Sequence, residues 1–320
     1  MLLKEIIIKS AEVGLRLQRK DGSFPAGRNG PWGDDDTPVR NTANWLKTFL
    51  FSYQQTNDNR FLNASNEALL YLLSGITRPY SLTFLCRTNR NECNGLIGQA
   101  WVLGGLEYYH RLFKVPKVLT VIKNNLCSHK FDEGRGLWYE LNIDGSPRRI
   151  CSTFNQQLCF SLVTFAAQRK RFIEKLDKNF SIYRSGLIKH VITGRQRKRR
   201  AVGYHSFNLY GFALLKEAYP NLPLWQSKKF QKALTYAQSP AYKKAIDKSP
   251  YGYPYNMTGI EIAYALYAFT GILHKEWIVE QFRRHFDFET FLMSKNTSDP
   301  ETLQARIYEA IRLPDVKIEI

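Results

Sequence analysis

The chain has 320 residues, 44% of them hydrophobic, and 46 Lys and Arg against 28 Asp and Glu give it a formal net charge of +18. This hydrophobic content is ordinary for a globular core, and no run approaches eighteen uncharged apolar residues, which excludes a predicted membrane span. No Ser/Gly/Pro-rich linker or low-complexity run divides the chain, so we expect one domain over residues 1–320.

The five cysteines indicate neither a disulfide framework nor a metal centre. Their number is odd and their spacing follows no small-domain pattern, which favours reduced thiols and a cytoplasmic protein. No second Cys or His pair follows Cys86 and Cys93 at ligand spacing, so no metal is expected. No nucleotide-binding glycine loop or redox motif is visible, and we therefore expect no cofactor.

Residues 1–17 are predicted to form an amphipathic helix, because apolar residues recur there at helical spacing. Lys4, Glu5 and Lys9 interrupt the apolar run, whereas the core of a signal peptide is uninterrupted.

The segment 21–45 is a polar and aromatic loop that leads into a helix. Three adjacent carboxylates stand close to cationic, amide and indole side chains, which together supply proton donors and acceptors, an anion partner and stacking faces. Sugar-binding sites are built from these same kinds of group. The alternative is an acidic turn before a helix start, which Asp, Thr and Pro all suit. The candidate residues here are Trp32, Asp34, Asp35, Asp36, Arg40, Asn41 and Trp45.

Most of the remaining chain is predicted to be helical. Apolar residues recur at intervals of three and four, with Pro and Gly at the joints. At an average helix length near a dozen residues, the chain accommodates roughly ten to fourteen helices. One extended piece is expected over residues 136–143, and Tyr139 within it is a candidate binding residue. The helical patterns cover 45–53, 64–73, 97–113, 118–126, 154–167, 207–218, 230–238, 260–269 and 278–286.

Four of these helices open with a cluster of polar and aromatic residues. If they are inner helices of a barrel that all begin at one end, their first turns surround one central cavity. The competing interpretation is that the amides cap helices and the aromatic residues belong to the core. The candidate residues are Asn94, Gln99, Trp101, Asn155, Tyr204, His205, Asn208, Tyr255, Asn256 and Glu261.

Three segments, 17–24, 94–101 and 302–310, resemble the (α/α)6-toroid carbohydrate enzymes. That superfamily includes the N-acylglucosamine 2-epimerase-like proteins, the unsaturated-glucuronyl hydrolases, and several polysaccharide lyases and uronyl epimerases. The resemblance implies an all-α toroid of alternating outer and inner helices, with a sugar site at its mouth. We find no residue-by-residue match to a pair of epimerase histidines or to the tryptophan-glycine motif of the glucuronyl hydrolases.

Several chemistries fit these residues. A hydrolase needs an acid and a carboxylate on either side of the scissile bond, for which the acids are Asp34, Asp35, Asp36, Glu140 and Glu261. A lyase or C5-epimerase of a uronic acid needs a base such as Tyr204 or His205, with Arg40, Asn208 or Asn256 beside the substrate carboxylate. The catalytic candidates are therefore Asp36, Glu261, Tyr204 and His205.

Two further classes stay open. The run from Gly33 to Thr37 resembles the Asp-x-Asp-Asp motif of class II terpene cyclases, except that Gly33 stands where the first Asp belongs. The other class is a non-catalytic basic toroid that binds an anionic glycan or another protein during polysaccharide assembly.

The positive charge is concentrated at Arg195–Arg200, where five of six residues are cations. Such a field attracts polyanions, although a charge run can also be a solvated loop that aids solubility. Nucleic acid is not favoured, because no helix-turn-helix, zinc-finger or RNP pattern is present. We expect an anionic oligo- or polysaccharide as partner, and an anionic membrane surface that carries a lipid-linked glycan would suit the same charge.

Overall fold

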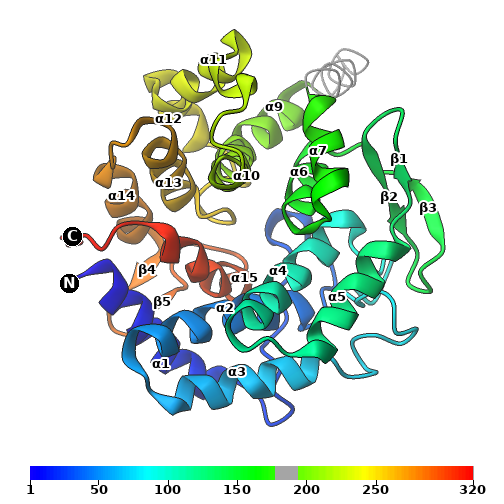
Figure 1. Ribbon diagram of the computed structural model, residues 1–320. Coiled ribbons are helices and arrows are strands. Elements are labelled where there is room, and N and C mark those ends of the chain that lie inside the picture. Colours follow the sequence, from blue (N-terminus) through cyan, green and yellow to red (C-terminus); the bar gives the residue numbers. More distant parts are fainter. Residues whose placement is uncertain (177–193, 320) are drawn as a thin grey trace.

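The computed structural model describes residues 1–176 and 194–319, whose helices form two concentric rings (Figure 1). Each inner element contacts the next, and the last contacts the first, so the inner ring is closed. In chain order the inner elements are α2 (Val39–Thr56), α4 (Gly95–Phe113), α6 (Phe154–Val163), α10 (His205–Ala218), α13 (Thr258–Thr270) and α15 (Pro300–Ala305), which continues as the 3-10 helix η4 (Arg306–Arg312).

The outer helices alternate with the inner ones along the chain and pack on their outer faces. Helices α1 and α3 contact α2, α5 contacts α4, α7 contacts α6, α9 contacts α10, and α14 contacts α13. This is the (α/α)6 toroid that the sequence resemblance implied. The outer helices are α1 (Leu3–Leu17), α3 (Asn59–Leu72), α5 (Pro116–Ser128), α7 (Ala166–Glu174), α9 (Gly194–Gly203), α11 (Lys228–Gln238), α12 (Pro240–Ile246) and α14 (Lys275–His285).

Two short antiparallel sheets and two further 3-10 turns complete the described part. The expected extended piece at 136–143 is confirmed as β2 (Leu137–Leu141), which pairs with β1 (Phe131–Asp132) and β3 (Pro147–Ile150). A second sheet joins β4 (Phe286–Asp287) and β5 (Leu292–Met293). The turns are η1 (Gly30–Trp32) and η3 (Pro223–Gln226).

Glycines allow the rings to approach closely at two points. A Cβ on Gly105 of α4 would lie 2.9 Å from the Ala43 carbonyl oxygen of α2, and one on Gly259 of α13 would lie 2.1 Å from the Trp277 carbonyl oxygen of α14. Both positions therefore require a residue without a side chain, despite a cost of about 1 kcal/mol in helix propensity.

The toroid is closed by the two ends of the described chain, which lie side by side in Figure 1. The backbone N–H of Leu3 donates to the Val316 carbonyl at 2.9 Å, and α1 packs on η4. Since outer and inner helices alternate in direction, all inner helices begin at the same end of the ring. No helix among the described residues is both long and apolar enough to cross a membrane.

Candidate active site

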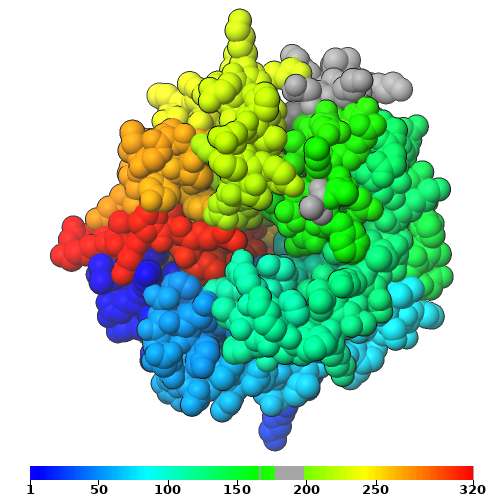
Figure 2. Space-filling view, viewed as in Figure 1, coloured from blue at the N-terminus to red at the C-terminus, as the bar shows by residue number. Residues whose placement is uncertain are grey.

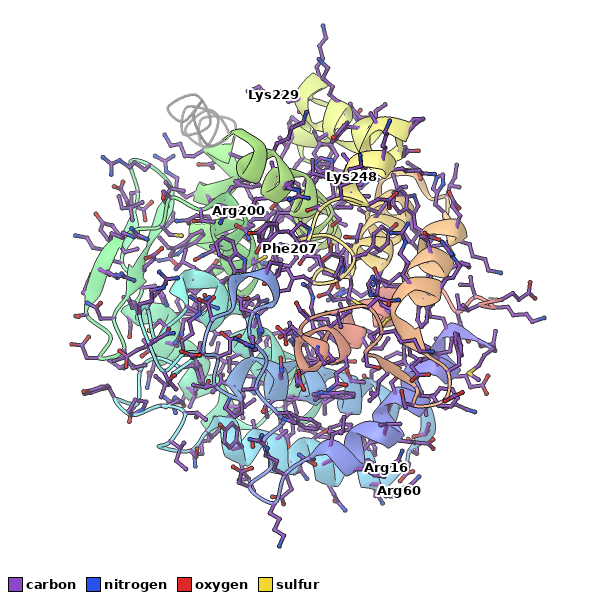
Figure 3. All side chains as sticks on the ribbon, turned by 180° about the vertical axis from the view of Figure 1, so that it is seen from behind. Arg16, Arg60, Arg200, Phe207, Lys229 and Lys248 are labelled. Atoms are coloured by element: carbon purple, nitrogen blue, oxygen red, sulfur yellow. The ribbon has the colours of Figure 1, made fainter. Side chains whose placement is uncertain are left out.

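A cavity of about 550 Å³ opens where the inner helices begin. Figure 3 shows Arg200 and Phe207, two residues of its wall, near the centre of the ring. The wall combines indole and phenol rings, side-chain amides and guanidinium groups. The predicted site residues that line it are Trp32, Asn94, Trp101, Asn155, Tyr204, Asn208, Tyr255 and Asn256.

The loop before α2 supplies one wall of the cavity and is tied to the start of α15. Asn29, Gly30 and Gly33 adopt positive φ angles of 56°, 56° and 61°, which turn the chain sharply around Trp32. The Asp299 carboxylate accepts hydrogen bonds from the backbone N–H of Arg28 at 3.0 Å and of Gly30 at 2.6 Å. These contacts tie the loop to the start of α15, the neighbour of α2 in the inner ring.

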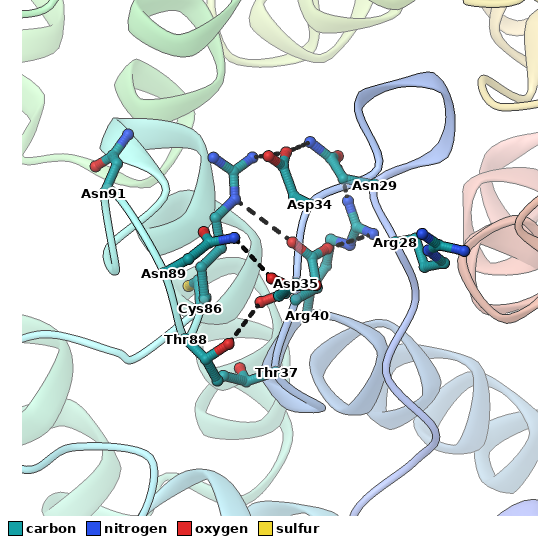
Figure 4. A network of polar contacts seen from close by, with 12 residues as sticks. Arg28, Asn29, Asp34, Asp35, Thr37, Arg40, Cys86, Thr88, Asn89 and Asn91 are labelled. Carbon is teal, nitrogen blue, oxygen red and sulfur yellow. Dashed lines mark hydrogen bonds and ion pairs between the residues drawn. The ribbon is translucent and has the colours of Figure 1, made fainter.

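Asp34 lies in the cavity wall, at the centre of a polar network (Figure 4). Its Oδ2 accepts from Asn29 Nδ2 at 2.7 Å and lies 2.6 Å from Arg87 Nη2. Asn29 Oδ1 in turn accepts from Arg40 Nη1 at 2.7 Å and from the Tyr255 hydroxyl at 2.6 Å. The network thus joins a carboxylate in the wall to two arginines and a phenol.

The other two aspartates of the triad point elsewhere. Asp35 is exposed and its Oδ2 accepts from Asn89 Nδ2 at 2.9 Å. The Asp36 side chain is only 2% exposed and lies behind the wall, 2.7 Å from Arg40 Nη2. Burial raises the pKa of Asp36, while Arg40 and Arg87 oppose the rise. Neither is among the lining residues, so Asp34, not Asp36, presents a carboxylate to the cavity.

Tyr204 is the residue before α10 and its hydroxyl accepts a hydrogen bond from Trp32 Nε1 at 2.9 Å. Burial, together with the neighbouring Tyr255, raises the pKa of Tyr204 well above its usual value. The phenol is therefore protonated at neutral pH and can act as a proton donor. Asn208, one turn further along α10, also faces the cavity.

Arg306 forms part of the cavity wall from η4 and is held by two buried carboxylates. Its guanidinium lies 2.6 Å from Glu261 Oε1 and 2.7 Å from Glu309 Oε1, and its Nη1 donates to Asn256 Oδ1 at 2.6 Å. Glu261 is fully buried and does not line the cavity. Burial raises the pKa of Glu261, and Arg306 acts in the opposite direction. The predicted catalytic Glu261 thus lies behind Arg306 and positions it.

His205 points away from the cavity although it follows Tyr204 directly. Successive residues of an α-helix are about 100° apart around its axis, so only one of the two can face inward. The His205 Nε2 lies 2.9 Å from the Ala233 carbonyl oxygen, and its ring packs on Tyr236 and Tyr242. Burial lowers the pKa of His205. A histidine in this environment does not reach a ligand in the cavity.

Four further predicted site residues have structural partners instead. Trp45 packs in a core cluster beside Phe24, because it lies on the outward side of α2. Asn41 Nδ2 donates to two backbone carbonyls. The Gln99 side chain accepts a hydrogen bond from the backbone N–H of Phe84 and donates one to its carbonyl oxygen. Tyr139 sits on β2 with Lys130 over its ring. None of the four lines the cavity.

The cavity wall carries an excess of positive charge. Among the described residues that line it, six are arginines and one, Asp34, is a carboxylate. Arg200 lies 4.3 Å from the centre of the Trp32 ring, so α9 brings part of the predicted basic cluster into the site. The side chains of 194–197 lie outside the described residues, while Lys198 and Arg199 are exposed. The arginines are Arg87, Arg90, Arg148, Arg149, Arg200 and Arg306.

Sequence reasoning missed Asn29 and most of these arginines as binding residues. Arg148 and Arg149 come from β3 and lie 3.8 and 3.1 Å from the buried carboxylate of Glu140, the acid that sequence reasoning considered for hydrolysis. Arg306 comes from the last inner element. No local motif marks them, and only closure of the ring brings them together.

Among the described residues, no group of three or more His, Cys, Asp or Glu is arranged to hold a metal ion.

Comparison with known proteins places this chain in a family. No family model matches it. It is 36% identical to archaeal glycosylation protein Q from Haloferax volcanii over 365 aligned positions, which cover 99% of this chain and 98% of that protein. The chain belongs to the archaeal glycosylation protein Q family.

Solved structures with the same fold are more distant in sequence. A D-mannose isomerase superposes with a TM-score of 0.64 at 12% identity, covering 97% of this chain and 95% of its own. The cellobiose 2-epimerase from Spirochaeta thermophila gives a TM-score of 0.56 at 13% identity, covering 97% and 96%. These likenesses confirm the predicted (α/α)6-toroid fold.

Proposed function

We propose that this member of the archaeal glycosylation protein Q family is a sugar epimerase or isomerase that acts on an anionic sugar or glycan intermediate. The observation that carries the proposal is the cavity with six arginines and a single carboxylate in its described wall. Guanidinium groups suit carboxylate and phosphate groups because they can donate two parallel hydrogen bonds. The glycosylation relative and the two sugar enzymes of the same fold support a carbohydrate as the substrate.

The cavity offers groups for each part of such a reaction. Epimerisation and isomerisation both remove a proton from a carbon next to a carbonyl group and return a proton. We assign the removal to the Asp34 carboxylate and the return to the Tyr204 hydroxyl, with the arginines neutralising the substrate anion and the developing enolate. Trp32 and Trp101 supply faces on which a sugar ring can stack.

Hydrolysis is less well supported by this geometry. Glycosidases place two carboxyl groups about 5 to 10 Å apart on either side of the bond, whereas the described wall carries Asp34 alone. The terpene-cyclase alternative needs adjacent aspartates directed into one cavity, and Asp35 and Asp36 are directed elsewhere. A uronate lyase would share the first proton removal and would differ in its product.

Hydrogen exchange with solvent tests the proposal. The purified protein is incubated in D₂O with glucuronate, glucose 6-phosphate, mannose or cellobiose, and deuterium in the recovered sugar is followed by NMR and mass spectrometry. We expect exchange and epimerised or isomerised product with an anionic sugar, and little with the neutral ones. An unsaturated uronate, which absorbs ultraviolet light, would indicate a lyase.

Matched variants test whether Asp34 and Tyr204 carry out the proton transfers. Asp34→Asn and Tyr204→Phe should lower kcat by roughly 10²- to 10⁴-fold, the usual effect of losing a general acid or base. Asp58→Asn and Tyr267→Phe are controls, because Asp58 caps α3 on the outer ring and Tyr267 lies at the exposed end of α13. Full activity of both site variants would refute the assignment. Binding of an anionic sugar without any exchange in the wild type would favour a non-catalytic glycan-binding protein.

A further inference from the structure

A second cavity, of about 810 Å³, lies at the opposite end of the inner ring. Its lining residues come mainly from α2, α4, α6, α10 and η4, mostly beyond the first turns of the helices, and Arg169 comes from α7. Trp101 and Phe207 line both cavities, so the two are back to back along the ring axis. In the view of Figure 2 the centre of the ring is hollowed between the C-terminal segment, in red, and the cyan-green segment of α4.

Lys47 of α2 is the unusual group of this second cavity. It lines the cavity and is only 9% exposed, and its Nζ lies 3.5 Å from the centre of the Tyr308 ring. Within the described residues this ring is the only partner found for its Nζ, which has neither a hydrogen bond nor an ion pair there. An ammonium group has three N–H donors, and because no described protein group accepts from them, they can pair with a ligand in the cavity.

The other cations of the cavity have partners. Arg312 lies 2.6 Å from the Glu217 carboxylate, and Arg111 lies 4.0 Å from that of Glu107. The Arg169 guanidinium donates to three backbone carbonyls at the end of α6, at 2.7, 3.0 and 2.8 Å. Lys47 is thus the cation of the described lining that lacks an acceptor.

We propose that the second cavity is a binding site for a small anionic sugar, whose carboxylate or phosphate group accepts hydrogen bonds from Lys47 Nζ. Three features support this ligand class. The described lining has four cations against two carboxylates, the ammonium lacks an acceptor, and aromatic faces for a sugar ring surround it. These faces belong to Phe51, Tyr108, Tyr210 and Tyr308. The site is separate from the proposed reaction in the first cavity and does not rest on it.

The ammonium also makes binding depend on pH. Burial lowers the pKa of Lys47 to about 7, with Arg312 and Arg306 acting in the same direction and Glu309 and Cys159 against it. Only the protonated form pairs with an anion, so affinity falls as the pH rises through 7. The other charged or titratable groups around the cavity are Glu107, Tyr108, Arg111, Arg169, Tyr210, Glu217 and Tyr308.

Calorimetric titration tests the site with glucuronate, glucose 6-phosphate, inorganic phosphate and neutral glucose. In the wild type at pH 6 we expect a binding event that Lys47→Met weakens roughly ten- to a hundredfold, the effect of losing hydrogen bonds to a charged group. The control variant Lys123→Met, on the exposed face of α5, should bind these ligands as tightly as the wild type. The affinity for glucuronate, whose carboxylate stays ionised, should fall about tenfold from pH 6 to pH 8.

Unchanged binding in Lys47→Met would overturn the proposal, as would binding of glucose as tight as that of glucose 6-phosphate. Inorganic phosphate binding as tightly as glucose 6-phosphate would overturn the assignment of a sugar.

A measurement on the wild type makes the test independent of how the variant folds. Reductive methylation with formaldehyde and cyanoborohydride, followed by peptide mass mapping, should be slowed at Lys47 but not at Lys123 by saturating glucuronate or glucose 6-phosphate. Equal methylation of Lys47 with and without these ligands would refute the site. The outcome is separable from that of the proposed function, because Asp34→Asn should abolish exchange and leave this protection intact.

Discussion

Replacing Lys47 with methionine should stabilise the protein in a way that depends on pH. The side chain is buried, and its pKa is lowered from 10.5 to about 7. A difference of about 3.5 units, at about 1.4 kcal/mol per unit, sets an upper limit of roughly 5 kcal/mol on the cost of the buried charge. Methionine has a similar length but also loses the contact of the ammonium with the Tyr308 ring, about 1 to 2 kcal/mol. A net gain of a few kcal/mol is therefore expected at pH 6.

The pH dependence follows from proton linkage. Because the pKa of Lys47 is lower in the folded state, the unfolded state binds more protons between about pH 7 and 10.5, and wild-type stability rises with pH over that range. Below pH 7 both states are protonated and the full cost is present. The advantage of Lys47→Met should thus be largest and constant below pH 7, and should shrink at higher pH.

Urea unfolding of wild type and variant from pH 6 to pH 10, in buffers without carboxylate or phosphate, measures this difference. Other titrating groups cancel when the two proteins are compared at each pH. Lys123→Met controls for the loss of a positive charge at an exposed position. A difference that does not change with pH, or a variant less stable than wild type at pH 6, would refute the reasoning.

Three other substitutions, with one matched control, test the packing and electrostatics of the toroid. Arg306→Met should lower the free energy of unfolding by about 3 to 5 kcal/mol, because it leaves two fully buried carboxylates without their counter-charge; a change in the melting temperature of less than a degree would contradict this. Burial lowers the pKa of His129 from 6.5 to about 4, so wild-type stability should fall by roughly 3 kcal/mol as the pH drops through that range, and His129→Gln should remove most of this acid sensitivity in urea titrations. Gly259→Ala should destabilise by about 1 to 3 kcal/mol because its Cβ meets a backbone carbonyl of α14. Gly104→Ala, whose nearest Cβ neighbour is 3.9 Å away, is the matched control and should be neutral or stabilising in thermal unfolding.

The architecture and much of the cavity could be predicted from local patterns. Apolar residues at intervals of three and four mark the helices, and the polar-aromatic clusters at four helix starts supplied Asn94, Asn155, Tyr204 and Asn256 to one cavity. Such predictions succeed because helical periodicity and chain direction are properties of neighbouring residues. Alternating helices in a ring then bring the starts of the inner ones to the same end.

The direction of individual side chains was less predictable. Tyr204 and His205 are adjacent, yet one faces the cavity and the other packs against α11, since the rotation of the helix about its axis is set by packing on both sides. The three adjacent aspartates likewise differ in their surroundings: Asp34 lies in the cavity wall, Asp35 is exposed and Asp36 is buried. The loop before α2, with its three positive φ angles, sets the direction of each carboxylate. The path of this loop depends on its contacts with Asp299, near the other end of the chain.

The charge of the cavity and the second site arise from long-range closure. Arg87, Arg149, Arg200 and Arg306 come from four separate regions of the chain, and composition reports only their total charge. Lys47 looks like an ordinary lysine in an amphipathic helix until α4, α6, α10 and η4 surround it. Burial and the loss of water, which change its pKa and leave its donors without acceptors, are properties of the assembled ring and not of any segment within it.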